Sequence, residues 1–456
     1  MFHPSLLATW LLLLSATATL AQPRNIVVFV ADDHGAEAYG AYGNTVVKTP
    51  NLDRLASEGV RFTHAFATTA SCSASRSVIL SGVHNHRNGQ YGHEHEYHHF
   101  VAFENVRTLP VMLAEAGYRT ARGGKFHVAP ETTFKFERVL KLPEIQNFIE
   151  KDVSRPFFLY YGTNEPHRPF RHDVEDRVDP KQVLVPDWLP DIPEVREELA
   201  LYYASVRSVD KTFGTVVEAL KRTGTYDSTL IIYLSDNGAA FPGSKTNVYE
   251  PGIRLPLVVK KPGSPRRGAT SDAMVSWVDL VPTILEFAGV RVAPPPASLP
   301  PVSPGSFKNE TPPIQGRSFL SVLDRDTTSG WDEVYGSHTF HEITMYYPMR
   351  VVRTRTHKLI WNIAHPLPYP FASDLQASKT WQGIVARSVT NIGPRPTKLY
   401  LQRPKFELYD LKSDPLESMN LADDPKHRTL LAELKAKLKA FQARTGDPWI
   451  LKWDYE

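Results

Sequence analysis

Two pairs of adjacent polar residues have the chemistry of a site for a hard cation. Asp32-Asp33 follows the apolar run 26–31, and Asp236-Asn237 follows the apolar run 230–234. Neighbouring carboxylates repel one another, so they need either a bound cation or a place in a surface loop. Four oxygen donors from two strand ends suit Ca²⁺ or Mg²⁺ better than a soft metal. Ordinary loops use the same residue types, so that interpretation of either pair alone stays open.

The single cysteine is the second candidate for chemistry. Cys72 lies in a segment of small and polar residues, 71–77, that leads into an expected helix. This placement puts the thiol near a helix N-terminus, where negative charge is stabilised. A buried structural cysteine is the alternative, but its neighbours would then be expected to be apolar. One cysteine also excludes an intrachain disulfide and any zinc or iron–sulfur site built from several cysteines.

The surrounding pattern predicts the elements that would position these residues. Four apolar runs without alternation predict strands buried on both faces of a parallel sheet: 26–31, 157–161, 230–234 and 255–259. Helical spacing of apolar residues separates them, over 51–59, 109–117, 194–224 and 277–288. This alternation indicates an α/β fold with helices on both faces of the sheet. Ligands of such sheets bind at the carboxyl ends of the strands, where the polar clusters fall.

The two ends of the chain have a different character. Residues 6–21 are apolar and then small, which predicts a secretory signal peptide, 1–21, and an exported protein with no membrane anchor after cleavage. A buried N-terminal helix is the alternative. Towards the C-terminus, 349–363 and 406–411 predict antiparallel strands, and 426–444 predicts an amphipathic helix. We therefore expect a catalytic domain over 22–347 and a smaller α+β subdomain over 348–456.

The overall charge excludes one class of partner. The chain has 52 Lys and Arg against 49 Asp and Glu, a net charge of +3. This balance is too mild for a nucleic-acid-binding protein. With 42% hydrophobic residues, the chain can bury a large core.

Five short motifs resemble the formylglycine-dependent sulfatase family in order and spacing. They are Asp32-Asp33, Cys72-x-Ala74-x-Arg76, Gly124-Lys125-x-His127, Glu165-Pro166-His167 and Asp236-Asn237-Gly238. The resemblance extends to the C-terminal Glu407-Leu408-Tyr409-Asp410 and covers nearly the whole chain after the expected signal peptide. It implies an alkaline-phosphatase-like fold, in which a mostly parallel sheet carries helices on both faces and a C-terminal subdomain contains an antiparallel sheet.

The resemblance also implies a role for each motif. Cys72 would become formylglycine, the nucleophile, and would lie beside one Ca²⁺ per chain held by Asp32, Asp33, Asp236 and Asn237. Arg76 and Lys125 would bind the hydrated aldehyde and the sulfate oxygens. His127 would assist the formylglycine hydroxyl, and His167 would protonate the leaving atom. Lys245 stands where the nearest members have arginine, as a second sulfate-binding cation.

Further segments resemble the family members that remove the N-sulfate from glucosamine in heparan sulfate and heparin. They are 90–92, 98–100, 130–132, 246–252 and 341–350. They predict a sulfated glycosaminoglycan oligosaccharide as substrate, with His98 or His99 contacting the acidic sugar and His341 and Glu342 the amino sugar. For Glu342 with His341, a plain surface loop is the alternative. The six histidines between His84 and His99 also admit a transition-metal site, although their spacing matches no zinc motif.

Several alternatives stay open at this point. An O-sulfatase acting on another glycan, a catalytically silent glycan-binding protein and a phosphate or phosphonate ester hydrolase share the same motifs or fold. Ala74 departs from the proline that most members have. The maturation partner is therefore either the aerobic formylglycine-generating enzyme or a radical-type enzyme. A monomer and a homodimer are both compatible with the sequence.

Overall fold

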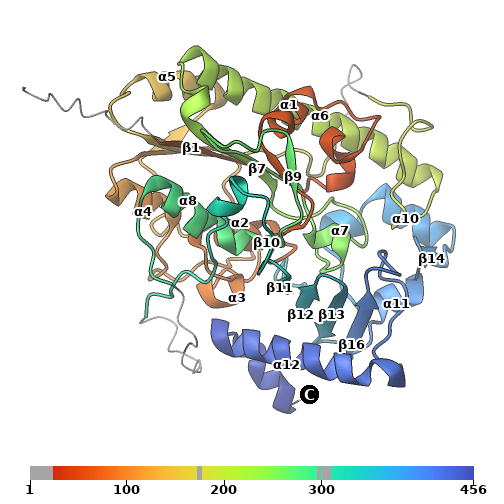
Figure 1. The fold of residues 1–456 in the computed structure, drawn as a ribbon. Helices are drawn as coiled ribbons and strands as arrows, with labels where there is room; N and C mark the ends of the chain where they lie inside the picture. The colour runs from red at the N-terminus through yellow and green to blue at the C-terminus, as the bar shows by residue number, and fades with distance from the viewer. Residues whose placement is uncertain (1–23, 172–176, 295–298, 300–309, 456) are drawn as a thin grey trace, which may run out of the picture.

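The computed structural model describes residues 24–171, 177–294, 299 and 310–455 (Figure 1). The expected signal peptide lies outside these residues. Among the helices of the described part, none is long and apolar enough to cross a membrane.

An eight-stranded sheet forms the centre of the larger region, in the order β5-β4-β6-β1-β7-β8-β2-β9. Its strands are β1 (Asn25–Ala31), β2 (Val60–Phe62), β4 (Arg119–Gly124), β5 (Arg138–Leu140), β6 (Phe157–Gly162), β7 (Thr229–Ser235), β8 (Leu257–Lys260) and β9 (Ala269–Ser271). The strand β1 pairs in parallel with β6 and with β7, whereas β8 runs antiparallel to β7 and β2. The mostly parallel sheet of the sequence prediction is confirmed. The run that forms β8 does not show its direction, because a buried strand is apolar in either orientation.

Helices cover both faces of this sheet, as predicted (Figure 1). One face carries α1 (Pro50–Glu58), α5 (Ile145–Glu150) and α6 (Pro193–Arg222), and the other carries α2 (Cys72–Ser81), α4 (Leu109–Glu115) and α8 (Leu280–Ala288). Alternate residues of β1 point to opposite cores: Val28 packs with α2, α4 and α8, and Phe29 packs with α1 and α6. This alternation is the geometry of a strand buried on both faces.

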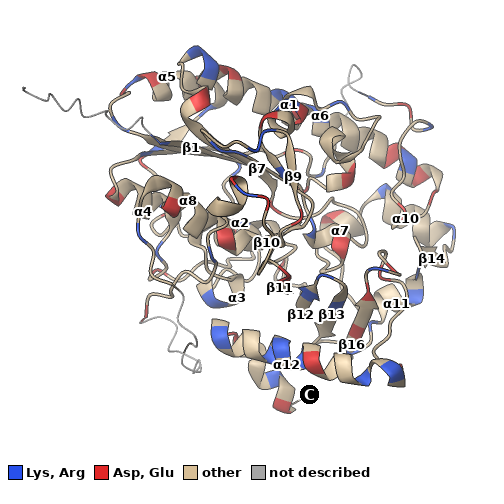
Figure 2. Cartoon of the chain, viewed as in Figure 1, with Lys and Arg blue, Asp and Glu red and all other residues tan. Residues whose placement is uncertain are grey.

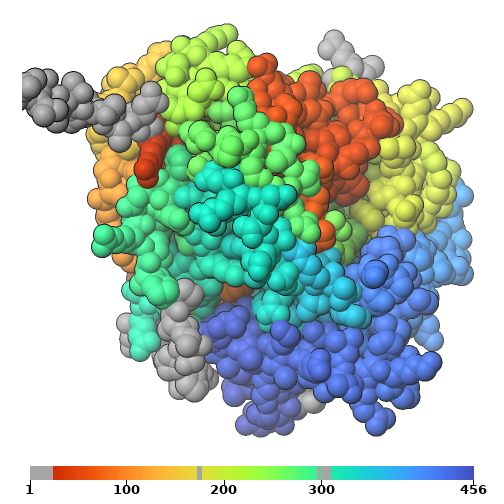
Figure 3. Space-filling model, in the orientation of Figure 1, coloured from red at the N-terminus to blue at the C-terminus, as the bar shows by residue number. Residues whose placement is uncertain are grey.

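A four-stranded antiparallel sheet forms the second region, in the order β11-β12-β13-β16. Its strands are β11 (Glu333–Phe340), β12 (Tyr346–Thr354), β13 (His357–Asn362) and β16 (Phe406–Asp410). The helix α12 (Arg428–Thr445) packs Leu434, Leu438 and Phe441 against this sheet. Residue 348, the predicted domain boundary, falls inside β12. In the space-filling view the C-terminal residues lie directly against the rest of the protein (Figure 3).

Buried charges join the two regions. Lys358 of β13 contacts Glu250 of α7 (Glu250–Ile253) at 2.8 Å and Glu417 at 2.7 Å, and Arg353 of β12 contacts Glu250 at 3.3 Å. Along the rest of the described chain, basic and acidic residues alternate without a large region of one sign (Figure 2). These ion pairs, which we call the joint, hold the C-terminal region against α7 of the larger region.

Candidate active site

The two acidic pairs meet because their strands are neighbours. Ala31 at the end of β1 lies opposite Ser235 at the end of β7, so the next residues of both strands emerge at the same edge of the sheet. The side chains of Asp32, Asp33, Asp236 and Asn237 are all buried. The Asp33 N–H donates to Asp236 Oδ1 at 3.1 Å, and Asn237 Nδ2 donates to Asp33 Oδ1 at 2.6 Å. Asp33 has a φ of 65°, which turns the chain sharply after Asp32.

Three cations from separate parts of the chain pair with the three carboxylates. Arg76 Nε lies 2.7 Å from Asp236 Oδ2 and Lys125 Nζ lies 2.5 Å from Asp32 Oδ2. Lys245 Nζ lies 3.0 Å from Asp33 Oδ2. Buried charges require such partners, because an unpaired ion in the interior carries a large desolvation cost.

The pairing shifts the pKa values of Asp32 and Lys245 in the direction that favours their charged forms. Burial alone would raise the pKa of Asp32, but Lys125, His167 and Arg76 outweigh burial and hold it below its usual range. Burial would lower the pKa of Lys245, yet Asp33 and Asp374 raise it well above the ordinary lysine value. Asp32 is therefore ionised and Lys245 is protonated at neutral pH, whereas burial raises the pKa of Asp236.

The single cysteine, Cys72, lies next to this cluster of carboxylates. Cys72 is the first residue of α2, and its thiol donates to Asp33 Oδ1 at 3.7 Å. The helix N-terminus predicted from the sequence is present, but it does not produce a thiolate. Burial, followed by Asp33 and Asp32, raises the Cys72 pKa well above its ordinary value. The unmodified thiol is therefore neutral and a weak nucleophile.

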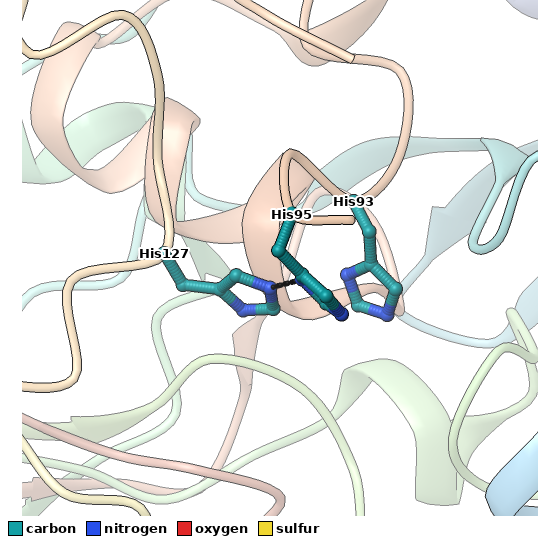
Figure 4. A group of neighbouring side chains, drawn as sticks. All are labelled: His93, His95 and His127. Carbon is teal, nitrogen blue, oxygen red and sulfur yellow. Dashed lines mark hydrogen bonds between the residues drawn. The ribbon is translucent and has the colours of Figure 1, made fainter. Parts of the chain in front are cut away.

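Histidines from three separate segments of the chain gather beside the site, and one of them contacts the residue before Cys72. His127 Nε2 lies 2.7 Å from His95 Nδ1, and Figure 4 shows these two rings facing one another with His93 beside them. His93 Nε2 lies 2.9 Å from His341 Nε2, and His341 Nδ1 lies 3.0 Å from Ser71 Oγ. Burial lowers the pKa of His93, His127 and His341 well below the usual histidine value, and nearby cations and histidines add to this effect. These imidazoles are neutral at physiological pH.

A pocket of about 480 Å³ opens between the cation cluster and these histidines. Its lining includes the predicted residues His98, Lys125, His127, His167, Lys245, His341 and Glu342. His99 is exposed and does not contribute to this lining. The pocket also has lining residues that were not predicted from the sequence: His93, Glu94, His95, Glu96, Ser373 and Asp374. The two histidines had a signal in the histidine-rich loop, whereas Ser373 and Asp374 belong to no motif and reach the pocket only through the fold.

Lys245 contacts both His167 and Asp374, a pocket residue that belongs to no sequence motif. Lys245 Nζ lies 2.8 Å from His167 Nε2 and 2.8 Å from Asp374 Oδ2. An ammonium group can only donate, so His167 Nε2 is the acceptor of this contact, and His167 Nδ1 lies 2.5 Å from the Arg168 carbonyl oxygen. Burial would raise the pKa of Asp374, but Lys245 and His167 lower it to about 2. Asp374 is therefore ionised in the pocket.

The oxygen cluster fits a hard divalent cation. Asn237 Oδ1 is buried and has no hydrogen-bond partner in the described part of the chain, so this acceptor is available to a cation. Ligand atoms of Asp32, Asp33 and Cys72 lie within 4.8 Å of one another. Carboxylate and amide oxygens are the ligands that Ca²⁺ prefers.

This arrangement of fold and site defines a class of hydrolase. The chain belongs to the sulfatase family, because the sequence model of that family matches residues 24–142 and 139–290. It is therefore a hydrolase of the sulfatase class. The family and fold recognised from the sequence motifs are confirmed.

Individual relatives resemble the chain over most of its length. Human N-sulphoglucosamine sulphohydrolase is 37% identical over 94% of this chain and 92% of that protein. An ulvan-active sulfatase of Formosa agariphila is 27% identical over 95% of this chain and 83% of that protein. A solved structure of a protein in complex with its substrate D-glucosamine-2-N,6-O-disulfate has a TM-score of 0.67 at 22% identity, covering 93% of this chain and 99% of that chain. At that identity, the structural likeness shows the fold alone.

Proposed function

We propose that the protein hydrolyses the N-sulfate of glucosamine residues in heparan sulfate or heparin fragments. The 37% identity to human N-sulphoglucosamine sulphohydrolase over 94% of the chain is the observation that carries this proposal. The reaction is R–NH–SO₃⁻ + H₂O → R–NH₃⁺ + SO₄²⁻. The same proposal includes export of the protein and maturation by a formylglycine-generating or radical-type enzyme.

Two groups that the chain would acquire complete the site. Asp32, Asp33, Asp236 and Asn237, with the residue derived from Cys72, would hold one Ca²⁺, which supplies positive charge beside the sulfate. Formylglycine made from Cys72 would supply a hydrated aldehyde as the nucleophile. The buried acceptor Asn237 Oδ1 and the neutral thiol of Cys72 support these two assignments.

The chain's own residues then bind the anion and move the proton. Arg76, Lys125 and Lys245 hold the negative oxygens of the sulfate and prevent them from repelling the nucleophile. His127 is neutral and lines the pocket together with Lys125, so we assign to it the proton of the hydroxyl of the modified Cys72. His167 presents Nε2 to Lys245 and the pocket, and protonation of His167 at this atom when substrate binds would supply the proton for the leaving nitrogen.

The wall of the pocket provides the sugar contacts in this proposal. His98, His341 and Glu342 line the pocket and are assigned to the glucosamine unit. His98 Nδ1 accepts from the Ile343 N–H at 3.1 Å, which ties the histidine loop to the segment carrying His341 and Glu342. His99 is exposed outside the pocket, so it is not included among these contacts.

Peptide mass spectrometry and a sugar panel test the proposal together. Conversion of the Cys72 thiol to an aldehyde lowers the peptide mass by about 18 Da. The matured protein is then assayed with glucosamine N-sulfate and with 6-O- and 2-O-sulfated sugars, using Cys72→Ala as the inactive control. Sulfate release from the N-linked position supports the proposal. Release from O-linked positions alone identifies an O-sulfatase, and an unmodified Cys72 with glycan binding but no release identifies a silent binding protein.

A further inference from the structure

Asp374 is an ionised side chain in the pocket that has no role in the proposed reaction. It belongs to α9 (Ser373–Gln376) of the C-terminal region, and its side chain is 21% exposed. Its Oδ2 atom lies 2.8 Å from Lys245 Nζ and 3.8 Å from His167 Nε2. Its Oδ1 atom has no hydrogen-bond partner among the residues that the structure describes.

A carboxylate at this position weakens the binding of a sulfated substrate. Lys245 already pairs with Asp33 at 3.0 Å, so Asp374 adds a second negative charge to a lysine assigned to sulfate. Like charges at close range cost binding energy, and a buried acceptor without a partner costs more. A pocket that binds only anionic oxygens would be better without Asp374. Its presence therefore points to a donor or a cation on the substrate.

The substrate of the proposed reaction has such a group at one place. The sulfamate nitrogen carries an N–H, and the product R–NH₃⁺ carries a full positive charge at neutral pH. An O-sulfate has no hydrogen on the bridging oxygen, and its product is a neutral alcohol. His167, which is assigned to protonate the leaving atom, lies 3.8 Å from Asp374 Oδ2, so the leaving atom would be close to the carboxylate.

We propose that Asp374 binds the nitrogen of the substrate and makes the enzyme selective for N-sulfate over O-sulfate. This assignment rests on the proposed function. The carboxylate accepts from the sulfamate N–H in the bound substrate and interacts more strongly as the nitrogen gains its proton. An interaction that strengthens during the reaction accelerates the chemical step. With an O-sulfate the same carboxylate faces only lone pairs, and a site built to bind an N–H rejects the analogue that lacks it.

The fold holds Asp374 in place through its neighbour. Glu342 Oε1 accepts from the Ser373 N–H at 2.9 Å and from Ser373 Oγ at 2.6 Å. Ala372 and Leu375 on either side are buried. Glu342 therefore positions the start of α9. Of the two pocket carboxylates Glu342 and Asp374, Asp374 is the one placed to contact the amino group.

A simpler role for Asp374, positioning Lys245, makes a different prediction. Lys245 is assigned to the sulfate, which N-linked and O-linked substrates share. Loss of a positioning residue would therefore lower the rate for both kinds of substrate by the same factor. Loss of a nitrogen-binding residue lowers the rate for the N-linked substrate only.

The test is Asp374→Asn in the matured enzyme, assayed with glucosamine N-sulfate and with an aryl sulfate. We expect kcat/KM for the N-sulfate to fall about 10- to 100-fold, the range for a lost hydrogen bond to a charged group, with less than about a 3-fold change for the aryl sulfate. Asp227→Asn is the matched control, because Asp227 is an exposed carboxylate outside this pocket, and it should keep both rates. Equal losses for both substrates, or no loss for either, would overturn the assignment.

A binding measurement separates this inference from the proposed function. Glucosamine should bind the wild-type protein at least about 10-fold more tightly than it binds Asp374→Asn, while N-acetylglucosamine, which has no charge on nitrogen, should not distinguish them. Calorimetry measures both affinities, and the measurement does not require conversion of Cys72 to formylglycine. If Asp374→Asn does not fold, Asp374→Ser takes its place. If the wild type releases no sulfate from glucosamine N-sulfate, the proposed function fails. If it does release sulfate but the variant keeps its selectivity and glucosamine affinity, only the role of Asp374 is wrong.

Discussion

The floor and the wall of the pocket are built in different ways. The floor, which we define as Asp32, Asp33, Cys72, Arg76 and Asp236, comes from the ends of β1 and β7 and the first turns of α2, and each of its side chains is fully buried. The wall, defined as His95, His98, Glu342 and Asp374, comes from loops and a short helix and is partly exposed. Rigid elements hold the charges that must not move, and accessible segments make the contacts that select a substrate.

The two parts also differ in their electrostatics. Each carboxylate of the floor has a lysine or arginine partner, because an unpaired charge at that depth would be costly. In the wall, His95 has a lowered pKa, caused first by burial, and Asp374 shares a lysine with the floor. The contrast predicts that changes in the floor abolish the reaction for every substrate, and that changes in the wall alter which substrates react.

The largest effect is expected for the nucleophile of the floor. Cys72→Ala removes the only side chain that can become formylglycine, so sulfate release should fall by about 10⁴-fold or more for N-linked and O-linked substrates alike. Sulfate release measures the loss, and a melting temperature close to that of the wild type shows that the fold is kept. A variant that retains a tenth of the activity would refute the role of Cys72.

Removal of the cation is expected to have the next largest effect. Without it, Asp32, Asp33 and Asp236 repel one another and the sulfate loses a source of positive charge, so activity should fall by about 10²-fold or more. Ca²⁺ at about 100 times its dissociation constant should also add about 2.7 kcal/mol to the free energy of unfolding. Chelation followed by Ca²⁺ addition, with metal analysis at each step, measures both effects. Full activity in metal-free protein would contradict the assigned site.

His167 contacts Lys245 between the floor and the wall. The effect of its replacement on the rate should depend on the leaving group of the substrate. His167→Gln should slow hydrolysis of glucosamine N-sulfate by about 10²- to 10⁴-fold, the range for a lost general acid. An aryl sulfate has a leaving group that departs without a proton, so its rate should change much less. Parallel assays with the two substrates provide the measurement. Equal losses would assign His167 to sulfate binding instead of proton transfer.

The same contrast explains what the sequence could predict. The floor was predictable because strands end in polar residues at fixed places in an α/β sheet, so Asp32-Asp33 and Asp236-Asn237 could be placed at one edge. Asp374 could not be predicted, since its neighbours form no motif and its 129-residue separation from Lys245 is closed only by the packing of the C-terminal region. The antiparallel direction of β8 was missed for a similar reason, because apolar runs do not record strand direction.

A substitution in the joint between the two regions should have the smallest effect on activity, but it should clearly lower the free energy of unfolding. Glu250→Gln removes the charge that Lys358 and Arg353 contact, at 2.8 Å and 3.3 Å. Breaking a buried ion pair typically costs about 3–5 kcal/mol, and we expect about 2–3 kcal/mol because Lys358 keeps Glu417 as a partner. The chemistry of the floor does not depend on this charge, so kcat should change less than about 3-fold.

The pH dependence of this variant identifies the cause of its instability. Burial would raise the pKa of Glu250, but Lys358 and Arg353 lower it to about 2, below the value of about 4.3 in the unfolded chain. A depressed folded pKa stabilises the protein above the unfolded pKa, and this contribution is lost as pH falls through the folded pKa. The difference in unfolding free energy between wild type and Glu250→Gln should therefore be constant at neutral pH and shrink from about pH 4 towards about pH 2. Urea unfolding at several pH values measures it.

Glu194→Gln is the matched control, because Glu194 pairs with Arg387, the residue after α10 (Lys379–Ala386), at 2.9 Å in an exposed ion pair. Exposed pairs contribute about 0.2–1 kcal/mol, so this variant should be nearly as stable as the wild type. If both variants lose the same stability, burial of the joint does not set its strength. If Glu250→Gln instead changes the preference between N-linked and O-linked substrates, the joint also determines where the C-terminal region places Asp374, and the wall is then positioned by the interface between the two sheets.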